Sequence, residues 1–182
     1  MKKERRRLFL LGLIVLLVGV ANAQQGPSTC QDRLPEKLRS EITKKFPSSK
    51  IEETSDLAPE YREMWVKAHS SDCPGVAVGK YKGAGRSLFG VLLVSTDPAK
   101  PGAKLLVVDP ASGNRFLVLE TVGIATASPN VIYTLPPGAY ADPEGGQKVR
   151  IPYDGVVLEQ LEVGSILYYY RAGTFHKLIL SE

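Results

Sequence analysis

The chain has 182 residues and a formal net charge of +4, from 23 lysines and arginines against 19 aspartates and glutamates. Five of the basic residues and one of the acidic residues lie in the first 23 positions, which leaves 18 of each sign in the rest of the chain. Because the excess positive charge is confined to this terminus, the rest of the chain has no net positive charge that would attract nucleic acid. Nucleic-acid-binding proteins are therefore excluded. The remaining length suits one domain.

The first 23 residues have the organisation of a secretory signal peptide. A basic start precedes thirteen apolar or glycine residues from Leu8 to Val20, and the segment ends in Ala21-Asn22-Ala23. The apolar stretch is shorter than the roughly 20 residues of a membrane span, and the small residues suit cleavage after Ala23. No cysteine follows that would carry a lipid anchor. We therefore expect a periplasmic or secreted protein with no stable membrane anchor after cleavage.

Residues 24–31 are predicted to form a flexible N-terminal lead, and residues 32–182 a single domain. Leu34, Leu38, Ile42 and Phe46 recur every four residues, which is the spacing of one helix face, and Pro47 cannot continue the helix. A second, weaker helical pattern covers residues 59–68. These two segments predict N-terminal helices.

The pattern changes from residue 76 onward, where short β-branched or aromatic runs are bounded by glycine, proline, aspartate and asparagine. The connections are too short for crossover helices, so neighbouring strands should pair antiparallel. Residues 136–138 and 142–146 are predicted to form one surface loop. The expected fold class is α+β, with N-terminal helices followed by a mainly antiparallel, meandering β-sheet. The predicted strands are 76–81, 87–95, 104–108, 115–122, 131–135, 156–161, 165–170 and 175–180.

The two cysteines, Cys30 and Cys73, are expected to form a disulfide, because both belong to an exported domain. An alternative remains open, since His69 lies four residues before Cys73 and its imidazole could generate a nucleophilic thiolate. That arrangement would make the protein a small secreted cysteine hydrolase. A disulfide would abolish it.

Residues 73–86, with the sequence CPGVAVGKYKGAGR and a hydrophobic strand after them, resemble a degenerate GDFDGDGKPDYAVLLV segment. Such segments occur in FG-GAP and VCBS-like exported proteins. Trp65 and His69 upstream, and the closing segments ILYYY at 166–170, FHK at 175–177 and LS at 180–181, are similar to small uncharacterised secreted bacterial proteins with one such loop.

The resemblance implies a calcium loop whose first, third, fifth and ninth positions supply oxygen ligands. Here those positions are occupied by side chains without a carboxylate, while the two glycines that permit the turn are retained. The resemblance therefore implies a loop that keeps its turn and binds no metal, and neither a metal nor another cofactor is expected. The loop residues concerned are Lys80, Lys82, Gly83, Ala84, Gly85 and Leu88.

The run Tyr168-Tyr169-Tyr170 lies in a predicted strand, so Tyr168 and Tyr170 share one face and are a candidate stacking surface for sugar or protein. Acidic residues such as Glu52 and Glu53 fall in segments typical of a solvated surface. The sequence thus predicts an exported, non-enzymatic binding or interaction module for an unidentified protein or polysaccharide. The alternatives are the cysteine hydrolase and an inhibitor or immunity-type protein.

Overall fold

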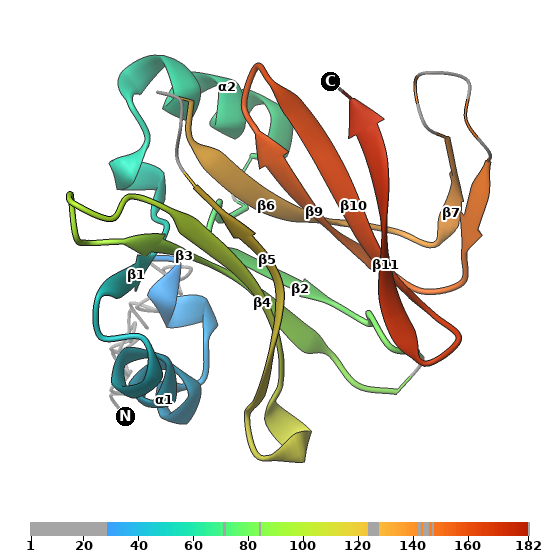
Figure 1. The fold of residues 1–182 in the computed structure, drawn as a ribbon, viewed down its shortest axis with the longest axis horizontal. Helices are drawn as coiled ribbons and strands as arrows, with labels where there is room; N and C mark the ends of the chain where they lie inside the picture. The colour runs from blue at the N-terminus through green and yellow to red at the C-terminus, as the bar shows by residue number, and fades with distance from the viewer. Residues whose placement is uncertain are drawn as a thin grey trace, which may run out of the picture.

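The computed structural model describes residues 29–70, 72–83, 85–123, 128–141, 143, 146 and 148–181 (Figure 1). The predicted signal peptide at 1–23 and residues 24–28 of the predicted lead lie outside the described residues. The same holds for Ala84 and for residues 142, 144 and 145 of the predicted loop. In the described part of the chain, no helix has the length and apolar character needed to cross a membrane.

The helical elements lie on the N-terminal side of most strands. The four-residue apolar period buries Leu38 and Ile42 on one face of the first α-helix. The second α-helix buries Trp65, whose indole Nε1 donates a hydrogen bond to the Asp72 carbonyl at 3.0 Å. The helical elements are η1 (Gln31–Arg33), α1 (Glu36–Lys45), η2 (Thr54–Asp56), α2 (Pro59–His69) and η3 (Pro110–Ser112).

The first sheet is antiparallel, with β4 between β3 and β5, and with β1 and β2 paired to different halves of the other side of β3. Its central strands are continuous apolar runs because both faces are covered: Val91 and Leu106 are buried on one face, Leu92 and Leu105 on the other. The strands are β1 (Ser49–Ile51), β2 (Val76–Gly79), β3 (Leu88–Ser95), β4 (Ala103–Asp109) and β5 (Arg115–Val122).

The second sheet is also antiparallel and has the order β11, β10, β9, β6. Its last two strands are joined by Ala172 and Gly173, which have φ of 49° and 90°, as a two-residue type I′ hairpin turn requires. A separate two-stranded hairpin follows β6. The strands are β6 (Asn130–Leu135), β9 (Gly155–Gln160), β10 (Gly164–Arg171) and β11 (Thr174–Ser181), with β7 (Gly138–Tyr140) and β8 (Val149–Ile151) in the hairpin.

The two sheets pack face to face, and the helices cover outer surfaces (Figure 1). The inner cluster joins Leu92 and Leu105 of the first sheet to Ile132 and Val156 of the second. The α1 helix packs on the outer face of the first sheet, while α2 and the β7–β8 hairpin pack on the outer face of the second. Each sheet is therefore buried on both faces over part of its area.

The sheets are joined along one side and separate along the other. Where β2 and β6 meet, Thr134 Oγ1 donates to the Val78 carbonyl at 3.2 Å, and the Ile132 amide donates to the Pro74 carbonyl at 2.8 Å. On the opposite side, β5 and β11 are edge strands, and no described strand pairs with their outer edges. A cleft lined by β5, β10 and β11 lies between them.

The mainly antiparallel sheet predicted from the sequence is confirmed, and a strand is present in each of the eight segments predicted to form one. The strands β1, β7 and β8, of three residues each, were not predicted. Gly138, which was assigned to a surface loop, instead begins β7 and pairs with Ile151. Since β1 lies between α1 and α2, helices and strands are also not fully separated along the chain.

Candidate functional site

The predicted disulfide between Cys30 and Cys73 is confirmed, with the two Cα atoms 5.4 Å apart. It links η1 to the segment before β2, and both cysteines are buried. The Glu53 carboxylate holds the same region by accepting hydrogen bonds from the backbone amides of Cys30 at 2.6 Å and Gln31 at 3.2 Å. Such a bond indicates an oxidising, extracellular compartment.

The cysteine hydrolase predicted as an alternative is wrong, because Cys73 is bonded and offers no thiolate. His69 instead ends α2, with its ring stacked on Trp65 at a centroid distance of 4.1 Å and 4.6 Å from the ring of Tyr133. Burial lowers the pKa of His69, which favours the neutral imidazole. His69 is a packing residue between α2 and β6.

In the glycine loop between β2 and β3, Gly83 and Gly85 have positive φ of 128° and 130°, a backbone conformation that favours glycine. The Lys80 amide donates to Asp154 Oδ2 at 2.7 Å, which fixes the start of the loop. Leu88, at the ninth loop position, is buried and begins β3. Among the described residues, no group of three or more histidine, cysteine, aspartate or glutamate side chains is placed to hold a metal ion.

Tyr81 in this loop has a structural role that the sequence does not predict. It is fully buried between the sheets, and its hydroxyl forms a 2.8 Å hydrogen bond with the Thr134 hydroxyl. A position next to a glycine turn does not predict a buried side chain. The side chain anchors the loop to β6.

The prediction that Tyr168 lies on an exposed face is wrong, because its side chain is 4% exposed and points between the sheets. The Tyr168 hydroxyl donates to Glu120 Oε2 on β5 at 2.8 Å, and Lys177 Nζ of β11 lies 3.9 Å from the same oxygen. Burial and the nearby Glu120 carboxylate raise the pKa of Tyr168, so it stays protonated as the donor. We call these three side chains the Glu120 tie, since they link β5 to β10 and β11 across the cleft.

The structure brings Lys82, Leu88 and Tyr170 together in one cavity of about 470 Å³, which we call the loop cavity. Tyr170 packs edge-on against Phe175 of β11, with the ring centroids 5.3 Å apart. Lys82 Nζ lies over both rings, at 5.6 Å from the centroid of Tyr170 and 5.9 Å from that of Phe175. The other predicted loop and tyrosine residues that the structure describes do not line it; these are Lys80, Gly83, Gly85 and Tyr168.

The loop cavity also contains one buried carboxylate, Asp109 at the end of β4. Its oxygens accept hydrogen bonds from the Ser112 hydroxyl at 2.8 Å and the Ala111 amide at 3.1 Å, and Arg86 lies 3.6 Å away. Burial alone would raise the pKa of Asp109, but these donors and the positive charge outweigh it and lower the pKa. Asp109 is therefore an ionised carboxylate whose oxygens are already bound within the protein.

Glu52 was expected on a solvated surface, and this expectation is wrong. Its side chain is 6% exposed, and its backbone amide donates to the Leu92 carbonyl at 3.1 Å, which continues the pairing of β1 with β3. Burial is the largest cause that raises the pKa of Glu52, to about 7, and the nearby Asp56 carboxylate adds to it. Glu52 is a buried carboxyl that follows β1 and lies beside β3.

None of the family models, curated proteins and solved structures compared with this chain matches it. The fold and the site therefore define the class of protein by themselves. It is a disulfide-bonded protein of two packed antiparallel sheets, with a cationic and aromatic cavity at one end of the cleft between them.

Proposed function

We propose that the protein is exported, to the periplasm or out of the cell, and binds an anionic polysaccharide in the loop cavity without changing it chemically. The observation that carries this proposal is the convergence of Lys82, Arg115 and Tyr170 on one cavity from three separate parts of the chain. The signal peptide pattern of the first 23 residues and the disulfide support the export.

The charges of the loop cavity favour an anionic ligand. Lys82 and Arg115 both line it, and neither forms an ion pair with a carboxylate among the described residues. Asp109, the opposing charge, is already neutralised by Arg86 and its hydrogen-bond donors. A ligand carboxylate or sulfate would therefore meet two cations that form no ion pair among the described residues, and Arg115 offers a planar fork for it.

The aromatic rings favour a sugar as the body of that ligand. Tyr170 and Phe175 form one wall of the cavity, and such rings present an apolar face with a polar end. Asp109 is the only carboxylate among the described residues that line the cavity, which supports binding over glycoside hydrolysis, since hydrolysis requires two carboxyl groups held across one cleft. If the loop is related to FG-GAP loops, Lys82 occupies the position of a calcium ligand. The turn would then supply the positive charge of a lysine side chain where such a loop would hold a metal ion.

The experiment is a binding titration of the purified protein with polygalacturonate, a polysaccharide with one carboxylate per sugar, and with dextran as the neutral control. Lys82→Glu and Arg115→Glu should each weaken polygalacturonate binding about tenfold or more, which corresponds to about 1.4 kcal/mol or more. Lys44→Glu, on the exposed face of α1, makes the same charge change away from the cavity and should have little effect.

Equal loss of binding in all three variants would mean that net charge alone is responsible, and unchanged binding in the two cavity variants would refute the site. Export is tested separately. Protein recovered from the periplasm or the culture medium should begin at Gln24, and an uncleaved N-terminus would refute the export prediction.

A further inference from the structure

A second cavity lies on the other side of the Glu120 tie and shares no lining residue with the loop cavity. Its volume is about 480 Å³, within the range of about 300–1,000 Å³ found for small-molecule sites. It lies between Val122 at the end of β5 and the inner face of β9, β10 and β11. We call it the apolar cavity.

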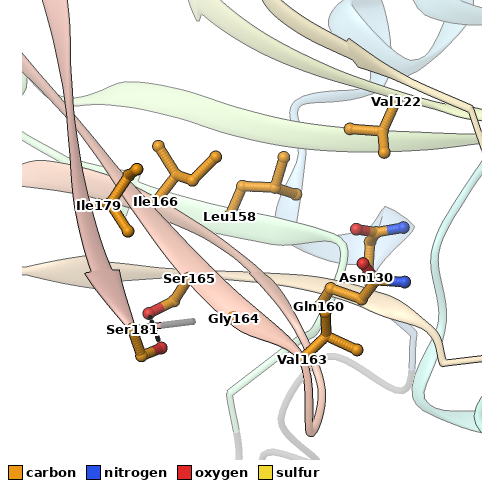
Figure 2. A pocket seen from close by; sticks show the side chains of 10 residues that line it. All are labelled: Val122, Asn130, Leu158, Gln160, Val163, Gly164, Ser165, Ile166, Ile179 and Ser181. Carbon is orange, nitrogen blue, oxygen red and sulfur yellow. Dashed lines mark hydrogen bonds between the residues drawn. The ribbon is translucent and has the colours of Figure 1, made fainter.

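Aliphatic side chains form most of its wall. Figure 2 shows Leu158, Ile166 and Ile179 side by side along the second sheet, with Val122 facing them from the first. Ile179 remains 37% exposed, whereas Leu158 of the same wall is 5% exposed. Enclosing a ligand chain at this wall would remove apolar surface from water, which favours binding.

The polar groups of the apolar cavity are uncharged and gathered on one side. Asn130 and Gln160 are direct cross-strand neighbours of β6 and β9, and Figure 2 shows their amides next to each other. Ser165 and Ser181 share a 2.8 Å hydrogen bond at the ends of β10 and β11. Because one hydroxyl of this pair donates to the other, the second hydroxyl hydrogen can be donated to a ligand.

Asn130 is the observation that points to a ligand. The residue is only 5% exposed, it lines the apolar cavity, and no described residue forms a hydrogen bond with its side-chain amide. Every fully buried side-chain nitrogen or oxygen among the described residues has a hydrogen-bond partner, so the unbonded Asn130 amide is open to the cavity it lines. The amide supplies both a donor and an acceptor to whatever occupies the cavity.

From this arrangement we propose that the apolar cavity binds an uncharged amphiphile with a single aliphatic chain. The chain lies against Leu158, Ile166 and Ile179, and an ester, amide or hydroxyl group of the ligand bonds to the Asn130 amide. An ionised head group is disfavoured, because none of the described residues lining the cavity carries a charge that would offset its desolvation. The site is independent of the proposed polysaccharide site, so either can fail without the other.

The test uses the full exported protein and the uncharged fluorophore N-phenylnaphthylamine, which brightens in apolar surroundings. Its emission should rise and saturate, and monolauroylglycerol should displace it below the micellar concentration. Laurate, which has the same chain and a carboxylate head, should compete at least about tenfold more weakly at pH 8. Equal competition by laurate would overturn the uncharged-head assignment, and emission that does not saturate would overturn the site.

Two variants locate the site within the protein. Ile179→Trp fills the cavity and should lower the affinity for the fluorophore about tenfold or more. The matched control is Val78→Trp, an equally large change at an exposed strand residue that lines none of the described cavities, and it should bind as the parent does. Unchanged binding in a folded Ile179→Trp protein, as judged by its melting curve, would overturn the location.

Asn130→Leu tests the polar contact, because leucine has the same branched side-chain skeleton as asparagine, with two methyl groups in place of the amide. The variant should bind the fluorophore at least as well as the parent and monolauroylglycerol about tenfold more weakly. If the affinity for monolauroylglycerol is unchanged, the Asn130 amide does not bind the head group and that part of the proposal is wrong.

Discussion

Replacing Glu52 by glutamine should make the protein more stable at neutral and alkaline pH. The carboxyl is 6% exposed, and burial together with the neighbouring charges raises its pKa from 4.5 to about 7. Asp56 and Glu53 add to this effect, while Lys50 opposes it. The folded state therefore holds a proton on Glu52 at pH values where the unfolded chain has lost it.

The sign follows from this difference in proton binding. Between pH 4.5 and 7 the folded state binds more protons than the unfolded state, so the free energy of unfolding falls as the pH rises. A shift of 2.5 pH units at 1.36 kcal/mol each gives a loss of about 3 kcal/mol that is complete above pH 7. Glutamine has nearly the same shape and no charge, so the variant should not incur this loss.

The assay is urea unfolding of Glu52→Gln and of the parent protein at pH 4 and at pH 8. The difference in the free energy of unfolding between the two proteins should change by about 3 kcal/mol in favour of the variant from pH 4 to pH 8. Glu60→Gln, at an exposed position in the first turn of α2, is the control and should show no such change. A constant difference for Glu52→Gln would refute the reasoning.

Two further predictions concern the disulfide and the glycine loop. Replacing Cys30 and Cys73 together by serine should lower the free energy of unfolding by about 4 kcal/mol, the chain-entropy value for a sequence separation of 43, and a loss below about 1 kcal/mol in a urea titration would contradict it. Millimolar calcium or a chelator should leave the melting temperature unchanged, because Lys80, Lys82 and Leu88 supply no carboxylate to the loop. Calcium at a hundred times its dissociation constant would otherwise add about 2.7 kcal/mol, so a rise of several degrees would show that the loop binds metal.

The longer strands could be predicted from the sequence because their signal is local. Each contains β-branched or aromatic residues between turn residues, and β3 has no polar side chain from Leu88 to Val94. The strands β1, β7 and β8 have three residues each and show no such pattern. Their pairing depends on partners distant in the chain, as in the case of β1 with the end of β3.

The site was predictable only in part, because burial is decided by what the other sheet covers. Strand alternation correctly separates Tyr168 from Tyr169, but it cannot say that β5 covers the face of Tyr168. The same limit explains Glu52, whose charge suggests a surface position although β3 and its surroundings bury it. Lys82 and Tyr170 were recognised separately, and their meeting in one cavity needed the packing of the two sheets.

The disulfide also determines how the protein behaves when it is cut by a protease. The bond joins Cys30 to Cys73, and the chain between them carries α1, β1, η2 and α2 as one closed ring. A single cleavage inside this ring opens it but releases no fragment, since both pieces stay attached through the sulfur atoms and through the packing of α1 on the first sheet. In a compartment with many proteases and no thiol reductant, a single cut in the helical segment therefore does not detach it from the rest of the protein. Such nicked molecules should separate into two fragments in a denaturing gel only after reduction.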